Sequence, residues 1–291
     1  MTPFSARFIG RDTWLISGEG CDAYLLLAEE EAVMIDAGCS TENIRAFAQT
    51  LTGLPVRAVV NTHSHFDHTG GNGWFEKVYG TAGIARGAKN TMGAPRALYP
   101  LDYEFSYVSD GEVLPLSGRP LMVLELDCHS PGDIVLLDVK HATLFCGDEV
   151  ESGQVLLLPG YAERTGQIHA SPAAAVETYR GALETMRRHG SAFDRLCPAH
   201  NGSPLPPVYL DWFATLCDKI LSGLVGDPDC ASPTYRREVL HFPFPEAGYR
   251  RAGYEGASLV YNERLLWEKD RAAGLDLFPA TPLHLVSAYS I

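Results

Sequence analysis

Short apolar runs separated by polar turns dominate the first part of the chain and predict a series of buried strands. Each run is bounded by glycine or by acidic residues, as is usual for strands in the interior of a protein. The predicted strands cover residues 14–16, 23–27, 32–36 and 57–61. Between the last two, apolar side chains recur at helical spacing over residues 42–51, which predicts a helix there.

Two amphipathic helices are predicted in the second half of the chain. The first begins with Ser171 and Pro172, a favourable N-cap and first-turn pair, and ends near Gly190. The second follows the proline-rich residues 204–207 and extends to Leu224. Further strands are predicted over residues 121–126, 134–138, 143–146, 195–197 and 257–261. This succession predicts a layered α/β body, with sheets facing each other and helices outside.

The composition fits one compact globular body. The chain has 291 residues, of which 46% are hydrophobic, and no Ser/Gly-rich linker or charge run divides it. We therefore expect a single domain over residues 1–291, in which residues 204–291 form a C-terminal helix-plus-strand portion that completes the fold. The sequence shows no repeat of fixed period.

Charge, cysteine content and the absence of long apolar stretches limit the partners and the cellular location that we expect. The formal net charge of −13 repels polyanions, so nucleic acid is not expected as a partner. The N-terminus lacks a signal-peptide pattern, and no stretch has the length of a membrane-spanning helix. Seven cysteines scattered without CxxC pairs argue against a disulfide framework. We expect a cytoplasmic protein without a membrane partner, and homo-oligomerisation stays open.

Potential metal ligands are most concentrated in the run Thr-His-Ser-His-Phe-Asp-His, directly after the strand predicted over residues 57–61. This run contains four metal-ligand candidates: His63, His65, Asp67 and His68. On a loop that leaves a strand, His63 and His65 can converge on one cation, while the other two turn toward a neighbouring point. Imidazole nitrogen and carboxylate oxygen are ligands of zinc and related divalent ions. A His-rich surface loop is the alternative, and an internal run of this spacing disfavours it.

This run resembles the signature of the metallo-β-lactamase superfamily, and the other parts of that pattern follow in order. Asp36 matches an early strand-end aspartate, and His129, in Cys-His-Ser-Pro-Gly-Asp, resembles the third element. Asp148, in Cys-Gly-Asp, resembles the fourth, and His200, in Pro-Ala-His-Asn-Gly, resembles the fifth. The resemblance implies an α+β fold, a four-layer αββα sandwich in which two mixed sheets pack face to face with helices outside.

The resemblance also implies two divalent metal ions, zinc in the first instance, with iron and manganese as alternatives. The implied ligands are His63, His65 and His129 for the first ion, Asp67, His68 and His200 for the second, and Asp148 as a bridge between both. Seven nitrogen or oxygen ligands are about right for two ions that share a water. Asp36 is expected to act behind the ligands, as an acceptor that fixes the His-rich loop.

Other polar residues are judged by their context. The remaining histidines stand alone in sequence and are expected not to be ligands: His141, His169, His189, His241 and His284. Tyr161 and His169 are candidates for the leaving-group acid because they follow Asp148. Asp133 stands where many relatives have His or Ser, a change that could alter metal preference or pocket charge.

Two ions that share a hydroxide can supply a nucleophile and polarise a carbonyl together. The sequence therefore predicts a hydrolase that uses a metal-bridging hydroxide on the ester, lactone, thioester or amide carbonyl of a small molecule. Asp67 would orient that hydroxide or accept its proton. Asp148 resembles the bridging residue of the lactonase, glyoxalase II and phosphodiesterase branches. The acidic chain disfavours a nuclease, and its C-terminal part lacks the basic surface expected of a glyoxalase II.

Three alternatives to carbonyl hydrolysis stay open. The same ligands could hold iron and support the oxygen chemistry of an oxidoreductase such as a sulfur dioxygenase. A phosphodiesterase would use a similar pair of ions. A non-catalytic, metal-stabilised binding module is disfavoured, because a degenerate site usually shows lost ligands and this one is filled.

Overall fold

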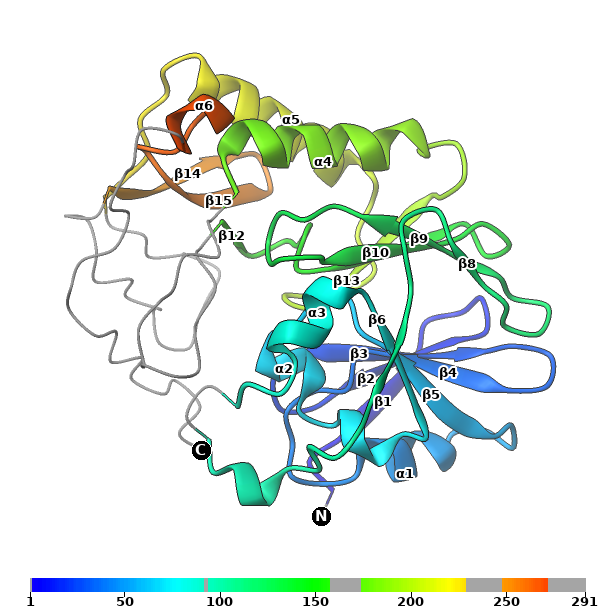
Figure 1. The fold of residues 1–291 in the computed structure, drawn as a ribbon. Coiled ribbons are helices and arrows are strands. Elements are labelled where there is room, and N and C mark those ends of the chain that lie inside the picture. The colour runs from blue at the N-terminus through cyan, green and yellow to red at the C-terminus, as the bar shows by residue number, and fades with distance from the viewer. Residues whose placement is uncertain (1, 92–93, 158–173, 229–247, 272–291) are drawn as a thin grey trace.

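The computed structural model describes residues 2–91, 94–157, 174–228 and 248–271, and its two main sheets face each other (Figure 1). The first sheet has seven strands arranged in chain order: β1 (Ser5–Phe8), β2 (Thr13–Ser17), β3 (Asp22–Leu27), β4 (Ala32–Ile35), β5 (Val56–Val60), β6 (Lys77–Gly80) and β7 (Phe105–Tyr107). Strands β1 to β4 pair antiparallel, whereas β4 to β7 pair parallel. The sheet is therefore mixed.

The second sheet has the strand order β13-β11-β10-β9-β8. Its strands are β8 (Val113–Leu114), β9 (Leu121–Glu125), β10 (Ile134–Asp138), β11 (Thr143–Gly147) and β13 (Arg195–Pro198). A third, small sheet places β15 (Ala257–Asn262) between β12 (Val155–Leu156) and β14 (Tyr249–Tyr254). Strands β11 and β13 are parallel, so the loops that follow them leave the same edge of the second sheet.

Helices cover the outer faces of the sandwich (Figure 1). The helices are α1 (Ile44–Gln49), α2 (Phe66–Thr69), α3 (Ala82–Gly87), α4 (Val176–Arg188), α5 (Val208–Leu221) and α6 (Glu268–Arg271), with 3₁₀ turns η1 (Asn72–Trp74) and η2 (Arg96–Leu98). One apolar cluster lies between the two main sheets, a second joins the first sheet to α1, and a third joins the other sheet to α4 and α5. These three apolar layers confirm the αββα sandwich. No helix among the described residues is both long and apolar enough to cross a membrane.

The ends of two helices differ from the expectation. Helix α4 begins at Val176 with Ala175 as its N-cap, so the expected start at Ser171 is wrong, and Ser171 itself lies outside the described residues. Helix α5 ends at Leu221, which leaves Leu224 beyond the helix and 41% exposed. The spacing of Leu224 continued the apolar pattern, but the side chain is not packed on the core.

A buried arginine ties the two main sheets together. The side chain of Arg119, in the loop before β9, is inaccessible to solvent, and its Nε lies 2.7 Å from Oδ2 of Asp138 at the end of β10. Its other nitrogens donate to Oγ1 of Thr13 and to the backbone oxygens of Asp12 and Leu27, which belong to the first sheet or its turns. A single guanidinium therefore satisfies acceptors from both layers.

We expect Arg119→Met to lower the free energy of unfolding by about 3–5 kcal/mol, because it leaves the Asp138 carboxylate buried without its cation. Urea unfolding followed by circular dichroism measures this change. Arg187→Met is the matched control, because Arg187 pairs with Asp211 and Glu184 at the surface, where ion pairs contribute little. Equal losses in the two variants would show that the Arg119 network does not stabilise the fold.

Candidate metal centre

The His-rich segment leaves the carboxyl end of β5 and turns at once into the short helix α2. His63 and His65 lie on the turn, and Asp67 and His68 lie in the helix. This tight path needs a glycine after the helix, since a Cβ on Gly71 would lie only 2.5 Å from the backbone oxygen of Ala37. The sequence therefore packs the motif directly against the loop that follows β4.

The other candidate ligands come from the second sheet. His129 follows β9, Asp148 follows β11, and His200 follows β13. These loops meet the His-rich segment at one edge of the sandwich, so residues from position 63 to position 200 converge. All seven predicted ligands fall into two groups in which three or more ligand atoms lie within 4.8 Å of one another.

The first group combines His63, His65, His129 and Asp148. Nε2 of His63 lies 3.7 Å from Oδ2 of Asp148, and Nε2 of His129 lies 3.5 Å from the same oxygen. Nδ1 of His65 lies 3.0 Å from Nε2 of His129. Three imidazoles and one carboxylate oxygen thus face a common point.

The second group combines Asp67, His68 and His200. Oδ2 of Asp67 lies 3.5 Å from Nε2 of His68 and 3.4 Å from Nε2 of His200. The other oxygen of Asp148, Oδ1, lies 3.3 Å and 3.4 Å from the same two nitrogens. Asp148 therefore stands between the groups, with Oδ2 directed at the first and Oδ1 at the second.

The unsatisfied polar atoms of the cluster fit a bound cation. Nε2 of His63, Nε2 of His68 and Oδ1 of Asp148 are buried and have no hydrogen-bond partner within the described part of the chain. Leaving such atoms buried without a partner costs stability. Their convergence with further nitrogen and oxygen atoms matches the donor set that divalent metals accept. These residues could hold a metal ion in either group.

Electrostatics around the cluster favour the metal-binding forms of the first group. Burial and the nearby His68 hold the pKa of His63 well below its ordinary value. Burial and His65 likewise lower the pKa of His129 to about 4. Burial opposes ionisation of Asp148, but His200 and His68 outweigh it and hold the pKa of Asp148 well below its usual range. The first group therefore presents neutral imidazoles and an ionised carboxylate.

The second group must lose protons to bind a cation. Burial opposes the charged form of His200, yet the facing Asp148 and Asp67 carboxylates raise its pKa well above the ordinary value. The pKa of His68 is also raised well above its ordinary value. Burial opposes its charge, but Cys21 and the Asp148 and Asp67 carboxylates outweigh this effect. Metal binding requires the neutral imidazole, so binding at this group should release protons.

The ring nitrogens that point away from the cluster are held by other groups. Nδ1 of His129 lies 3.0 Å from the backbone oxygen of Leu156, in β12. Nδ1 of His63 lies 3.1 Å from Oγ1 of Thr62. Such contacts fix the ring orientation and leave the opposite nitrogen free for a metal.

Asp36 makes the contacts that its expected supporting role requires. Its carboxylate accepts hydrogen bonds from the backbone N and from Oγ1 of Thr62, at 2.8 and 2.7 Å. Its Oδ2 also lies 2.9 Å from Nδ1 of His68, so that nitrogen carries the proton and Nε2 faces the cluster. Asp36 adopts a left-handed backbone conformation (φ 59°), which is uncommon for aspartate and aims the carboxylate at the motif.

We expect Asp36→Ala to weaken metal binding by about 10–100-fold without preventing folding, because it releases His68 and Thr62 together. Competition with a chromophoric chelator measures the affinity. Asp12→Ala is the matched control, since Asp12 is also an aspartate of positive φ (49°) but lies away from the cluster. If Asp36→Ala kept wild-type affinity, Asp36 would be a turn residue only.

Several residues near the cluster make supporting contacts that the local sequence does not reveal. Glu149 accepts a hydrogen bond from the backbone N of His129 at 2.8 Å, and Asp133 accepts from the backbone N of Cys128 and Ser130. Asp133, noted in the sequence for its unusual type, thus holds the loop that carries His129. Cys21 is buried in a group with Asp36 and His68, and nothing local in the sequence connects it to them.

The histidines expected not to be ligands are partly accounted for. Nδ1 of His141 lies 3.0 Å from the carboxylate of Asp138, and His189 is the C-cap of α4. Neither belongs to a group of described residues that could hold a cation. The remaining predicted non-ligands and leaving-group candidates lie outside the described residues: Tyr161, His169, His241 and His284.

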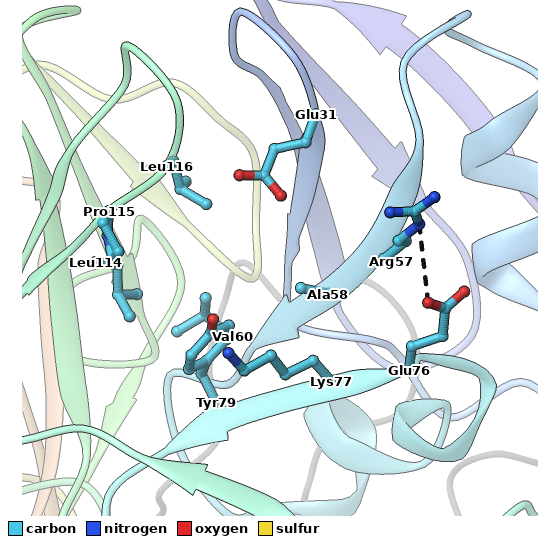
Figure 2. A pocket seen from close by; sticks show the side chains of 10 residues that line it. All are labelled: Glu31, Arg57, Ala58, Val60, Glu76, Lys77, Tyr79, Leu114, Pro115 and Leu116. Carbon is cyan, nitrogen blue, oxygen red and sulfur yellow. Dashed lines mark ion pairs between the residues drawn. The ribbon is translucent and has the colours of Figure 1, made fainter.

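A separate hollow lies along β5 and β6 (Figure 2). It has a volume of about 330 Å³ and lies between Ala58 and Val60 on one side and the loop around Pro115 on the other. Its charged rim is partly paired, with Arg57 3.8 Å from Glu76. This hollow lacks the convergent histidines of the metal cluster.

The order and geometry of the cluster agree with a family match over residues 16–200, to the metallo-beta-lactamase superfamily. The chain belongs to this superfamily. Among curated relatives, a superfamily thioesterase of Gallus gallus, acyl-coenzyme A thioesterase MBLAC2, is 28% identical over 170 residues, which cover 48% of this chain and 61% of the relative. The hydroxyacylglutathione hydrolase of Parasynechococcus marenigrum is 29% identical over 131 residues, or 43% of this chain and 49% of that protein.

The superfamily fold is also seen in solved structures. A metallo-beta-lactamase from Pontibacter korlensis aligns over 73% of this chain and 98% of its own, with a TM-score of 0.55 and 18% identity. The curated relatives above are matched over only about half to three fifths of their length. The family and the fold are thus shown.

Proposed function

We propose that this chain hydrolyses a thioester with the help of two divalent metal ions, zinc being the first choice and iron or manganese the alternatives. The proposed ligands are the residues of the two groups: His63, His65 and His129 for one ion, Asp67, His68 and His200 for the other, and Asp148 for both. The placement of Asp148 carries the proposal, because its two oxygens face different groups at 3.3–3.7 Å.

When bound, two such ions would polarise a substrate carbonyl and lower the pKa of water between them. Asp67 supplies the proton acceptor. Burial opposes its charge, but His68 and His200 hold the pKa of Asp67 well below its usual range, so the carboxylate is ionised at neutral pH. Its side chain is 19% exposed, so solvent reaches it.

The choice of a thioester rests on the relatives. Acyl-coenzyme A and hydroxyacylglutathione, which appear in the names of those proteins, are both thioesters. The formal net charge of −13 weighs against a nucleic-acid substrate, which would be repelled at long range. A small thioester that reaches the metals directly is compatible with this charge.

A substrate panel tests the proposal. Protein reconstituted with zinc, iron or manganese is assayed on acyl-coenzyme A, acylglutathione, oxyester, lactone and phosphodiester substrates, and its metal content is measured by elemental analysis. We expect two ions per chain and the highest kcat/KM on a thioester. Faster turnover of a phosphodiester, or thioester hydrolysis that survives complete removal of metal, would overturn the proposal.

A further inference from the structure

Asn201, the residue that follows His200, is hydrogen-bonded to the loop after β11. Its Nδ2 donates to Oε2 of Glu151 at 2.7 Å, and its backbone oxygen accepts from Oγ of Ser152 at 2.6 Å. Asn201 has a left-handed backbone conformation (φ 61°), which turns its side chain back toward this loop. The loops that carry Asp148 and His200 are therefore joined by side-chain contacts next to the metal ligands.

The Glu151 side chain, which accepts this hydrogen bond, is itself buried and held in place. Glu151 is only 3% exposed, and its second oxygen, Oε1, accepts from the backbone N of Gln154 at 3.2 Å. The chain at Gly153 passes so close to Asn201 that a Cβ there would collide with the amide nitrogen. A buried acceptor and a glycine contact thus fix the position of one amide group.

His200 is more exposed than three of the other histidines of the cluster. Its side chain is 20% exposed, whereas those of His63, His68 and His129 are at most 5% exposed. No hydrogen bond reaches its Nδ1 within the described residues, although each of those three histidines has a partner at that nitrogen. Among the described residues, the hydrogen bonds that hold the His200 loop in place come from its neighbours in the chain.

Both neighbours are held. On one side, the backbone N of Ala199 donates to the oxygen of Gly147, and the backbone N of Asp22 donates to the oxygen of Ala199. On the other side lies the contact between Asn201 and Glu151. We propose that Glu151 and Asn201 are positioning residues, a clamp that keeps His200 facing Asp148 and Asp67. This inference rests on the proposed two-ion site and concerns its second ion.

Zinc titration of the full-length apoprotein against a chromophoric chelator tests the clamp. Asn201→Gly removes the amide but retains a residue that accepts the left-handed conformation. Gly153→Ala displaces the amide without changing either polar group. We expect both variants to bind the first ion as the wild type does and the second about 10–100-fold more weakly. Glu255→Gly, at another position of positive φ (52°) in the turn between β14 and β15, is the matched control.

An exchange of the two polar groups provides a stricter test. Asn201→Asp alone places two carboxylates next to each other. Glu151→Gln combined with Asn201→Asp restores a hydrogen bond between an amide and a carboxylate, with the same total charge as the wild-type pair. The measurements are made at pH 8, because burial raises the pKa of Glu151 to about 7. We expect the single variant to lose the second binding step and the double variant to recover it to within a few-fold, the signature of direct coupling.

The outcomes separate the clamp from the proposed function. A wild-type protein that binds fewer than two ions would overturn the two-ion site before any variant is compared. A wild-type second binding step in Asn201→Gly and Gly153→Ala would overturn the clamp alone, and so would a double variant no better than Asn201→Asp. Weakened second binding with recovery in the double variant supports the clamp.

Discussion

Replacing Asp148 by asparagine should leave the protein with at least one bound metal ion but with little hydrolytic activity. The substitution keeps the shape of the side chain and removes the charge that offsets repulsion between two cations about 3.5–4 Å apart. We expect kcat to fall by more than about 100-fold, beyond the range typical of an outer-sphere partner. The pH profile should move to higher pH, because the attacking water is less acidified. Measurements of kcat against pH, with metal analysis of the same samples, check this.

His63→Ala provides the contrast. His63 is 1% exposed and contributes to the first group only, so its loss should empty that group, whereas Asp148→Asn should weaken mainly the link between the two. Wild-type turnover with two metals bound in Asp148→Asn would show that Asp148 does not bridge. The sequence Gly147-Asp148 would then be an ordinary turn at the end of β11.

Asp67→Asn should lower kcat by about 10²–10⁴-fold, the usual contribution of a positioned acid or base, while changing KM much less. The amide retains an oxygen toward His68 and His200 but can no longer accept a proton. Steady-state kinetics at saturating metal measure both constants. Saturating metal is needed because Asp67 is also a proposed ligand of the second ion.

Asp22→Asn is the matched control for this prediction. Asp22 is another partly buried aspartate near His200, but its Oδ1 accepts from Oγ of Ser17, and it belongs to neither metal group. Its amide variant should keep kcat within a few-fold of the wild type. Equal losses in the two variants would indicate a general effect of charge near the site, and Asp67 would not be the proton acceptor.

Local sequence signals predicted most of the sandwich. The strands β2 to β5, β9 to β11, β13 and β15 coincide with continuous apolar runs, because a strand buried on both faces needs apolar side chains at nearly every position. Most of the missed strands lack such a continuous run. Strand β14, for example, contains Arg250, Arg251 and Gly253 and lies at the edge of the small sheet, where it is held by pairing with β15.

The candidate ligands could be found because their spacing and order form a recognisable pattern. Their supporting residues could not, because they depend on contacts between distant loops. Glu151 and Asn201 are fifty residues apart and meet only because β11 and β13 run parallel and end at the same edge. Cys21 approaches His68 through a similar long-range contact. Such partners follow from the topology of the sheets, which local periodicity does not specify.

Polar side chains of the two sheets meet at opposite ends of the sandwich. The Arg119 network joins them beside the end of β10, where Asp138 pairs with the first residue of β11, and the metal cluster lies beyond the last residue of β11. Metal bound at the cluster would therefore add a polar link at the end opposite Arg119, between layers that the apolar cluster already holds together.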